Sequence, residues 1–466
     1  MARFEAVLEK FRNRRKMRFS TTQIIALGFF ILIMVGSILL TLPISSADGT
    51  WTNYLDSLFT ATTSSCVTGL VVVNTFEHWS IFGQIVILLL IQLGGLGVVT
   101  LSTMVLMILG RRITIKERML IQEAYNLDTL KGLVKLTRRV VRVTLIIEGI
   151  GALLYMTVFI PEFGLKGIWI SVFNSISGFC NAGIDIIGPD SLVPYVTNPM
   201  VNIVTMLLIV VGGIGFMVWW DVARVVKMKV KEHLPFRSCL QKFSLHTKIV
   251  LTMTIALIFG AAIIFMIFER NNAATIANMT FGEKIMACFF QSVTLRTAGF
   301  QTITQQSFMP GTKFLSVILM IIGGSPGGTA GGIKTVTVAV IILTALSSLR
   351  GKRDVEVFRR HISKDTVLKS VSVLVVGLGT FFVSTLLLSI VQSQSMVDIM
   401  FETSSAIGTV GLTHGLTGLL TNPGKLIIIL TMYIGRVGPI SMALLFNVNS
   451  KKKNSYQLPE EKIMVG

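Results

Sequence analysis

The chain has 466 residues, of which 52% are hydrophobic and only 14% are charged, and its mean hydropathy is +0.74. A water-soluble domain of this size would carry about 25% charged residues, so the composition excludes a soluble protein and indicates a polytopic membrane protein. Eight apolar runs come close to the roughly 20 residues that a spanning helix needs. They cover residues 22–43, 81–109, 143–160, 199–220, 247–268, 313–346, 370–391 and 424–446.

The first apolar run, 22–43, has a signal peptide as its alternative interpretation. Its apolar stretch is longer than the roughly 7–15 residues of a typical signal-peptide core. It also opens a unit that recurs three more times along the chain. We therefore expect this helix to be kept as the first span.

The net charge of +19 is concentrated in alternate loops. Most of the 42 Lys and Arg residues lie in five stretches, at residues 1–18, 111–142, 224–248, 350–369 and 451–462. Eight spans place all five stretches on one side, and the positive-inside rule makes that side cytoplasmic, with both termini there. We interpret the charge as a topology signal and as contact with anionic lipids. Nucleic acid is not an expected partner, because no stacking aromatic residues accompany the charge.

A Phe followed ten positions later by a Gly recurs four times, each time after small and hydroxylated residues. The pairs are Phe59/Gly69, Phe173/Gly183, Phe289/Gly299 and Phe401/Gly411. A further glycine follows each pair inside an apolar run, at Gly94, Gly212, Gly323 and Gly435. We predict an all-α polytopic membrane protein in which four pseudo-repeats of helix, pore half-helix with loop, and helix surround one central pore with eight spans. The predicted parts are a cytoplasmic N-terminus 1–17, units 18–115, 136–230, 243–349 and 365–448, and a cytoplasmic tail 449–466.

The segment before each glycine is too short to cross a membrane. The stretches 54–65, 283–293 and 397–406 would reach about 16 Å as helices, roughly half of a bilayer core. A half-helix that enters from one side must return to it, and its returning backbone cannot face lipid because its carbonyls would lack partners. It can only line a wet cavity or pack inside protein, which indicates a pore.

The glycine loops suit a dehydrated potassium ion, which needs several oxygen dipoles at once. Backbone carbonyls turned inward provide them, and glycine reaches the necessary backbone angles without strain at Cβ. The alternative, that these glycines only let helices pack closely, does not account for four of them in matched register. The predicted selectivity-filter residues, which would bind K⁺, are Val67, Thr68, Gly69, Asn181, Ala182, Gly183, Thr297, Ala298, Gly299, Thr409, Val410 and Gly411.

Two features break the fourfold pattern and predict a gate. The stretch 323–332 holds six glycines and a proline, so it cannot form a stable continuous helix and must line the cavity below the filter. A phosphate-binding loop is disfavoured, because Ile333 stands where that motif needs Lys. Arg436 replaces the second glycine of the pairs found in the other units, and it could form a charge barrier, bond carbonyls of the broken helix, or do both. The predicted gating residues are Gly323, Gly324, Ser325, Pro326, Gly327, Gly328, Thr329, Ala330, Gly331, Gly332, Lys334 as an anchor, and Arg436.

Other charged residues lie near the loops. For Arg296, three positions before Gly299, we expect a structural bond to loop carbonyls. Four acidic residues are predicted near the outer mouth, where they would either concentrate cations or serve ordinary capping and solvation. They are Asp56, Glu283, Asp398 and Glu402.

The chain resembles the Trk/Ktr/HKT superfamily of potassium transporters, and within it the bacterial KtrB-type membrane subunits. The resemblance spans essentially the whole chain and rests on VTG, NAG, RTAG and TVG in order, on LGGLG and VGGIG, and on IGGSPGGTAGGIKT and IGRVGP. It implies potassium selectivity, because glycine stands at all four filter positions, and it implies that 323–332 is an intramembrane gating loop. It also implies a homodimer on a ring of cytosolic, nucleotide-binding regulatory subunits (KtrA-like). The Tyr-Gly that follows the filter in potassium channels is missing here, which implies a shorter filter.

The sequence therefore predicts potassium uptake across the cytoplasmic membrane through a gated, channel-like pore, with Na⁺ left open as an activating ion and no covalently bound cofactor. The alternative is an ion-coupled secondary transporter of another cation or small solute, for which inverted repeats would be expected. A membrane enzyme is disfavoured, because the sequence has no HExxH motif and no aspartate cluster.

Overall fold

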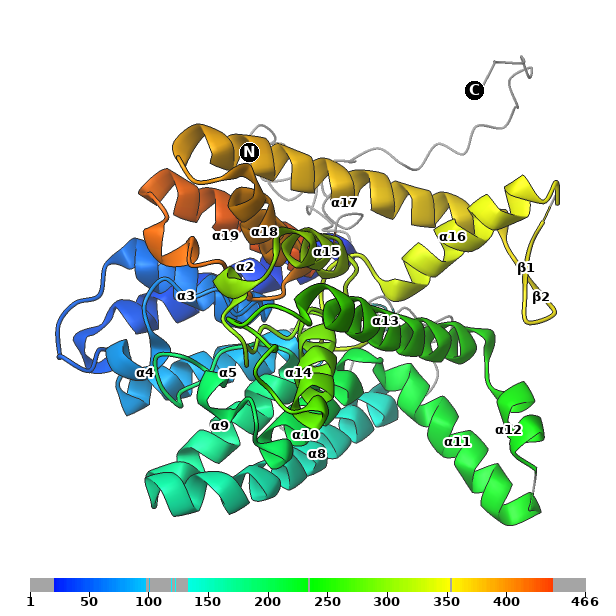
Figure 1. The fold of residues 1–466 in the computed structure, drawn as a ribbon, viewed down its shortest axis with the longest axis horizontal. Helices are drawn as coiled ribbons and strands as arrows, with labels where there is room; N and C mark the ends of the chain where they lie inside the picture. Colours follow the sequence, from blue (N-terminus) through cyan, green and yellow to red (C-terminus); the bar gives the residue numbers. More distant parts are fainter. Residues whose placement is uncertain are drawn as a thin grey trace, which may run out of the picture.

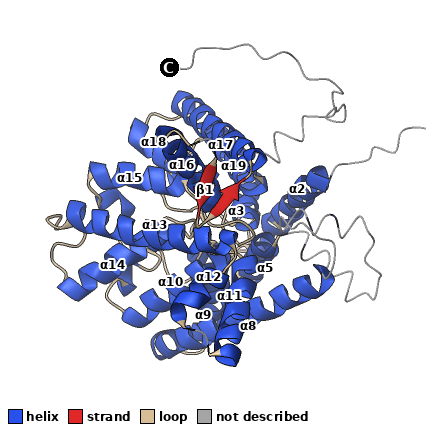
Figure 2. Ribbon diagram, turned by 90° about the vertical axis from the view of Figure 1, so that its right-hand side faces the viewer, coloured by secondary structure: helices blue, strands red, loops and turns tan. Residues whose placement is uncertain are grey.

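The structure is a computed structural model that describes residues 21–97, 100, 119, 122, 133–233, 235–352 and 354–438. The predicted N-terminus 1–17 and tail 449–466 lie outside the described residues, as do the ends of the apolar runs 81–109 and 424–446. The described part is a helical bundle with one small hairpin, formed by β1 (Val355–Val357) and β2 (Arg360–Ile362). Figure 2 looks onto this hairpin, which is drawn in red in front of the helices.

Four helices in the described part are long and apolar enough to cross a membrane. They are α2 (Thr21–Thr41), α8 (Leu133–Phe163), α13 (Leu245–Glu269) and α17 (Lys364–Val391). The side chains of Ser244 and Ser363 cap the starts of α13 and α17 by accepting backbone N–H bonds. The run 143–160 was the shortest predicted span, and α8 extends it at both ends to a full crossing length.

A short helix follows each long one. These are α3 (Tyr54–Cys66), α9 (Lys166–Cys180), α14 (Phe281–Thr294) and α18 (Met396–Gly408). Each has 13 to 15 residues and so reaches about 20 Å, which is less than a bilayer core. Asn53 and Ser395 cap α3 and α18, and Thr280 with Glu283 forms a capping box on α14. The three stretches predicted as half-helices are thus short helices.

The apolar run after each short helix is interrupted. Continuous spans were predicted for three of these four runs. The helices are α5 (Ile81–Leu96), α10 (Pro199–Gly213) with α11 (Phe216–Glu232), α15 (Pro310–Ile321) with α16 (Thr335–Leu349), and α19 (Asn422–Val437). Glycines with positive φ cap the ends of α5 and α19, at Gly97 (85°) and Gly438 (96°), and a third, Gly215 (94°), lies in the break before α11. Other residues rarely adopt this conformation, so a helix cannot continue through it. Between α10 and α11 the axis bends by 98°.

The predicted count of eight spans therefore does not follow from helix length alone. By length and composition, four described helices qualify, or five crossings if the bent α10–α11 pair is one of them. The shorter apolar helices α5, α15 and α16 each fall below spanning length. Only the run 313–346 was predicted to be broken, and it is broken between α15 and α16.

Short elements complete the described chain. They are α4 (Thr75–His78), α12 (Phe236–Lys242), η1 (Pro43–Ser45), η2 (Val193–Tyr195), η3 (Gln305–Ser307) and η4 (Thr417–Leu419). Figure 1 shows α12 and the β1–β2 hairpin on one side of the molecule and α4 on the opposite side. The basic stretches 224–248 and 350–369 contain α12 and the hairpin, so they share a side.

The core lies around the short helices. Phe59, Phe173 and Phe401 are completely buried, while Phe289 in the equivalent place is half-buried beside a buried Phe290. The recurring Phe of the sequence pattern thus holds each short helix in the protein interior. This burial fixes the short helices so that their C-terminal ends meet near the middle of the molecule.

Candidate functional site

The four predicted glycine loops begin where the short helices end. Their glycines all have positive φ, at Gly69 (95°), Gly183 (64°), Gly299 (81°) and Gly411 (98°). The residue two positions earlier also has positive φ in every loop, at Val67 (57°), Asn181 (62°), Thr297 (68°) and Thr409 (51°). The sequence predicted unusual backbone angles only at the glycines. Three of the four additional residues are β-branched, which seldom adopt this conformation, so residue type gave no signal for them.

The four glycines form a closed ring, which we call the glycine ring. A Cβ added to each would collide with the carbonyl oxygen of the residue before the glycine of the next loop. The collisions run from Gly69 to Ala182, from Gly183 to Ala298, from Gly299 to Val410, and from Gly411 back to Thr68. No side chain fits at any of the four positions without movement of the backbone. The structure thus brings the predicted filter loops to one place, in chain order around an axis.

Hydroxyl groups of the short helices hold the loops. In the first and fourth loops, Thr63 Oγ1 and Ser405 Oγ each accept the ring glycine N–H at 3.0 Å. In the second and third loops, Ser177 and Thr294 donate to the carbonyl of the residue after the glycine, at 2.5 and 2.6 Å. The hydroxyl-rich composition before each glycine therefore has a local role, because it pairs buried backbone groups that would otherwise lack partners.

The third loop differs from the other three. In loops one, two and four, the N–H of the residue before the glycine bonds the carbonyl five positions back, at 2.8 Å in each case, as in a Schellman motif. In the third loop Ala298 N–H bonds the carbonyl of Thr294, four positions back, at 2.9 Å. The helix cap there is Leu295 in the right-handed region, and the chain turns at Thr297. The fourfold pattern is therefore close but not complete.

Glycines of the following helices pack directly on the loops. A Cβ at Gly94, Gly212 or Gly435 would collide with the carbonyl oxygen four residues before the ring glycine of the same unit. Those carbonyls belong to Ser65, Phe179 and Ile407. In the third unit, Gly323 instead packs against the carbonyl of Gly331, within its own glycine-rich stretch. These contacts explain why a glycine recurs in each second helix.

The stretch 323–332, which we call the glycine-rich segment, is irregular, as predicted. Ser325 and Thr329 donate their backbone N–H groups to Gly213 and Gly212 at 2.9 and 3.2 Å, and Gly327 accepts from Phe216 at 2.9 Å. The segment thus satisfies the backbone groups freed by the break between α10 and α11. Because the helix α15 precedes it and not a strand, the phosphate-binding loop interpretation is wrong.

The segment also contacts the ring loops. Thr329 Oγ1 donates to the carbonyl of Phe179 at 3.1 Å, beside the second loop. Added Cβ atoms at Gly331 and Gly332 would meet Thr409 and Gly408, at the start of the fourth loop. The segment therefore lies directly against two of the four loops.

Lys334 and Arg436 tie the segment in place. Lys334 Nζ donates to the carbonyls of Ala330 and Gly331 at 2.6 and 3.3 Å, as expected of an anchor. The Arg436 guanidinium donates to the carbonyls of Thr329 and Gly94, and to that of Gly95 at 3.3 Å. This is the carbonyl-bonded arrangement that was one of the two interpretations of Arg436. It links α19, α5 and the segment.

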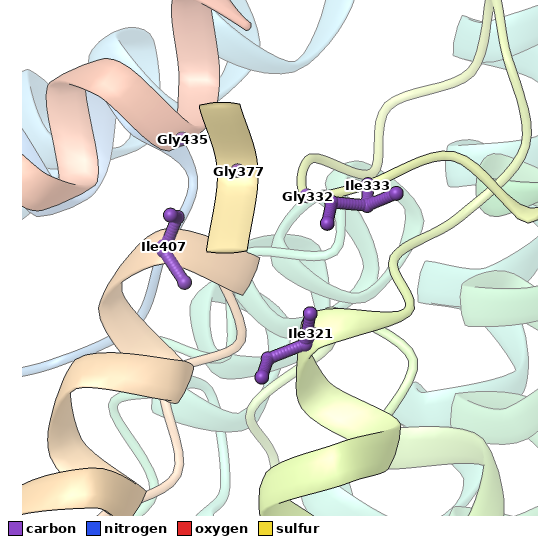
Figure 3. Close-up of a pocket in the computed structure, with 6 residues that line it drawn as sticks. All are labelled: Ile321, Gly332, Ile333, Gly377, Ile407 and Gly435. Carbon is purple, nitrogen blue, oxygen red and sulfur yellow. The ribbon is translucent and has the colours of Figure 1, made fainter. Parts of the chain in front are cut away.

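A small apolar cavity borders the segment on the side of the fourth unit (Figure 3). Its walls come from the end of α15, the segment, α17, α18 and α19. The lining residues are Ile321, Gly332, Ile333, Gly377, Ile407 and Gly435. Gly332 and Ile333 thus line this small cavity.

The prediction for Arg296 is wrong. Its guanidinium does not bond loop carbonyls; Nη2 donates instead to Thr254 Oγ1 on α13, at 3.4 Å. The side chain is buried, with 7% of the residue exposed, and its Nε has no hydrogen-bond partner within the described part of the chain. Leu295 keeps the chain helical for one more residue, which carries Arg296 away from the loop and toward α13.

The four outer acidic residues are satisfied locally. Asp56 pairs with Lys425 at 2.5 Å and Asp398 with His414 at 2.7 Å. Glu283 accepts two bonds from Thr280, which lower the pKa of its carboxyl group. Glu402 is fully buried and accepts from Thr413 at 2.7 Å and from Thr417. These contacts favour capping and loop support over attraction of cations.

Comparison with known proteins places these features in context. A family model described as a cation transport protein, TrkH, matches residues 4–457. The potassium/sodium uptake protein NtpJ of Enterococcus hirae is 41% identical, over 98% of this chain and 99% of that protein. The Ktr system potassium uptake protein B of Bacillus subtilis is 39% identical, over 98% and 100%. The crystal structure of the potassium transporter TrkH from Vibrio parahaemolyticus has a TM-score of 0.71 at 16% identity, over 94% of this chain and 87% of that one, which is a likeness of fold.

Proposed function

The chain belongs to the TrkH family of cation transport proteins, and from this premise we propose that it is a membrane subunit that takes up potassium through a gated, channel-like pore. It is a multi-pass cell membrane protein and a transporter, not an enzyme. The relatives named for potassium uptake match it along nearly their whole length. The glycine ring is the observation that carries the proposal.

The proposed selectivity filter consists of the ring loops 67–69, 181–183, 297–299 and 409–411. Their carbonyls supply dipoles without full charges, so that a potassium ion can bind and also leave. The four short helices direct their C-terminal, partly negative ends toward the ring, which favours a cation there. Glycine at all four positions is the feature that supports potassium as the preferred ion.

The proposed gate is the glycine-rich segment together with Lys334 and Arg436. The segment lies against the second and fourth loops, and a small cavity borders it at Gly332 and Ile333 (Figure 3). Arg436 adds a positive charge beside the ion path, which would oppose potassium until the segment shifts. In this arrangement the helices form four pseudo-repeats with the bounds given above and eight crossings, of which several are broken.

The proposed assembly is a homodimer that binds a separate cytosolic ring protein with nucleotide-binding domains, similar to KtrA. Relatives named as parts of a Ktr system support the need for other components. In this proposal both termini and the basic stretches lie on the cytoplasmic side, where they would face this ring and anionic lipids. We propose Na⁺ as an activating ion, and one relative is named a potassium/sodium uptake protein.

Tracer uptake tests the proposal. The full chain is expressed in a bacterium that lacks its own potassium uptake, and labelled potassium is followed with and without sodium. We expect uptake that saturates with potassium, that rises when sodium is present, and that Gly299→Ala abolishes. Gly260→Ala is the matched control, since a Cβ at Gly260 on α13 meets nothing within 4 Å. Uptake no greater than in cells with the empty vector, from protein correctly inserted in the membrane, would refute the function.

A further inference from the structure

The segment 412–417, which we call the return segment, leads the chain away from Gly411 in the glycine ring. The helix α18 holds this segment through two carboxyl groups. One of them, Glu402, accepts from Thr413 Oγ1 at 2.7 Å and from Thr417. The other reaches the segment through an imidazole side chain. The path of the chain just beyond the ring glycine therefore depends on bonds to titratable groups.

His414 carries this imidazole, three positions after Gly411. Its Nδ1 lies 2.7 Å from Asp398 Oδ1 in the first turn of α18. Its ring stacks on that of Phe401, with the two centroids 3.7 Å apart and the planes 25° from parallel. Its backbone carbonyl accepts from Gln306 Nε2 of the third unit at 2.6 Å. The residue thus joins the return segment both to α18 and to the neighbouring unit.

The surroundings of the imidazole fit its neutral form. The Asp398 carboxylate also accepts from Ser395 Oγ at 2.6 Å, so it acts as an acceptor and we assign the ring hydrogen to Nδ1. Only 2% of the His414 side chain is exposed, and in the part of the chain that the structure describes its Nε2 has no hydrogen-bond partner. A proton on Nε2 would create a buried N–H donor without an acceptor, which is costly.

Charged groups from two helices act on the imidazole. Burial has the largest effect and lowers the pKa of His414 below its usual value. The positive charge of Lys313 on α15 acts in the same direction, while the bond to Asp398 on α18 opposes both. Glu402, also on α18, is the other titratable group that holds the return segment. The imidazole therefore stays neutral near neutral pH and gains a proton only in an acidic medium.

The return segment lies far from the basic hairpin. The helix α17 begins directly after β2, in the stretch 350–369, and runs for 28 residues to Val391. At 1.5 Å per residue it spans about 40 Å. The helix α18 begins shortly beyond its far end, and Asp398 lies in its first turn (Figure 1). His414 therefore lies toward the outer side in the proposed orientation.

The fourth unit alone has a titratable side chain three positions after its ring glycine, since the other units hold Val72, Ile186 and Thr302 there. We propose that His414 is a positioning residue for the glycine ring, and that its protonation from the outer side weakens potassium binding in the ring. The proposal rests on the proposed function, because its ligand is the potassium ion. A protonated imidazole must turn out of its buried place to find an acceptor, so the return segment loses its stacking on Phe401 and the ring loop before it loses support.

The test follows the KM of tracer potassium uptake by cells that lack their own potassium uptake and express the full chain, as the external pH falls from about 7.5 to about 5. We expect a constant KM near neutral pH and a rise on acidification, by at most about tenfold per pH unit because one proton is involved. His414→Asn keeps a donor for Asp398 but cannot be protonated, so its KM should follow no such rise.

The neighbouring charges should move this rise in opposite directions, which a purely structural role would not explain. Lys313→Met removes a positive charge and should move the rise to higher pH, whereas Asp398→Asn should move it to lower pH. Lys166→Met is the matched control, because Lys166 is an exposed lysine at the start of α9 in the second unit. It should leave the pH of the rise unchanged.

The remaining outcomes also decide the proposal. A wild-type KM that does not change with pH would overturn it. A rise that persists in His414→Asn, or that disappears in Glu402→Gln, would assign the titration to another group and overturn it as well. If His414→Asn does not reach the membrane, Lys313→Met decides, because it keeps the imidazole. A wild type that takes up no potassium at neutral pH would refute the proposed function instead, so the two failures are distinguishable.

Discussion

The glycine ring and the layer of interrupted second helices keep the fourfold pattern to different degrees. Around the ring, each glycine meets the same carbonyl of the next loop, and the series closes on itself. In the second layer, Gly94, Gly212 and Gly435 pack on their own loops, but Gly323 packs within the glycine-rich segment. The fourfold pattern is therefore complete in the backbone contacts of the ring, but the third unit departs from it in the adjacent layer of second helices.

The difference indicates how one chain can separate two tasks, ion selection and gating. An ion on an axis needs equal ligands from all sides, and backbone carbonyls provide them whatever the neighbouring side chains are. A movable barrier needs only one element, which must be held weakly enough to shift. The glycine-rich segment is held by carbonyl bonds from Lys334 and Arg436, residues without counterparts in the other units, and by backbone bonds to the break between α10 and α11.

Deletion of residues 324–331 tests the proposed gating by the glycine-rich segment and should have the largest effect. Without the segment, the contact of Thr329 with Phe179 beside the second loop and that of Gly331 with Thr409 in the fourth loop would be lost. We expect basal potassium flux to rise by about tenfold or more, as a barrier of over 1.4 kcal/mol is removed. Tracer flux in liposomes measures it, with potassium-to-sodium selectivity as the second readout.

The selectivity readout separates the two layers. If the ring is independent of the segment, the deletion variant should conduct more while preferring potassium as the wild type does. Flux that is unchanged or lost, in protein that elutes as a folded species, would count against a gate in this segment.

Serine substitutions in the glycine ring test its proposed role in ion selection. Gly69→Ser and Gly411→Ser each place a side chain where even a Cβ collides with the next loop's carbonyl, and each residue has a φ above 90°. We expect the potassium-to-sodium selectivity ratio to fall about tenfold, because the loop must move and the hydroxyl adds a ligand suited to a smaller ion. Gly260→Ser on α13 is the control. An unchanged ratio in both ring variants would refute the filter assignment.

The ring was predictable because its signal is local and repeated. A glycine at fixed spacing after a Phe, with hydroxyl residues between, predicted the short helices and the positive φ of all four glycines. The long helices followed from apolar composition alone. Both features depend on residues close to one another in sequence.

The second layer was only partly predictable, because distant contacts decide it. The breaks at Gly97, Gly215 and Gly438 follow a recurring G-x-x-G spacing, yet the same glycines would be tolerated in a continuous membrane helix. The partner of Arg296 depends on one extra helical residue, Leu295, which is invisible in the sequence pattern. Positive φ at Val67 and Thr409 likewise opposes their own preferences and results from helix caps imposed by packing.

Arg436→Ala should have a smaller effect than the deletion. It removes the bonds to Thr329 and Gly94 and a positive charge beside the ion path, but it leaves the segment attached through Lys334 and the α10–α11 break. We expect basal flux to rise several-fold and the unfolding temperature to fall, since buried carbonyls lose donors. Arg436→Lys keeps the charge and should restore part of the block. Normal basal flux in a folded Arg436→Ala protein would leave this residue a structural role only.

The smallest effect is expected where the ring depends on a single hydroxyl. Ser405 Oγ accepts the Gly411 N–H at 3.0 Å in a fully buried setting, so Ser405→Ala leaves a backbone donor without a partner. The cost should be about 1–3 kcal/mol of unfolding free energy, seen as a lower unfolding temperature. Ser404→Ala is the matched control, because Ser404 bonds only the carbonyl of Phe401 within its own helix. If the ring and the gate are separate layers, Ser405→Ala should also weaken potassium selectivity slightly while basal flux stays at the wild-type level. A leak in Ser405→Ala equal to that of Arg436→Ala would show instead that the loops and the segment move as one unit.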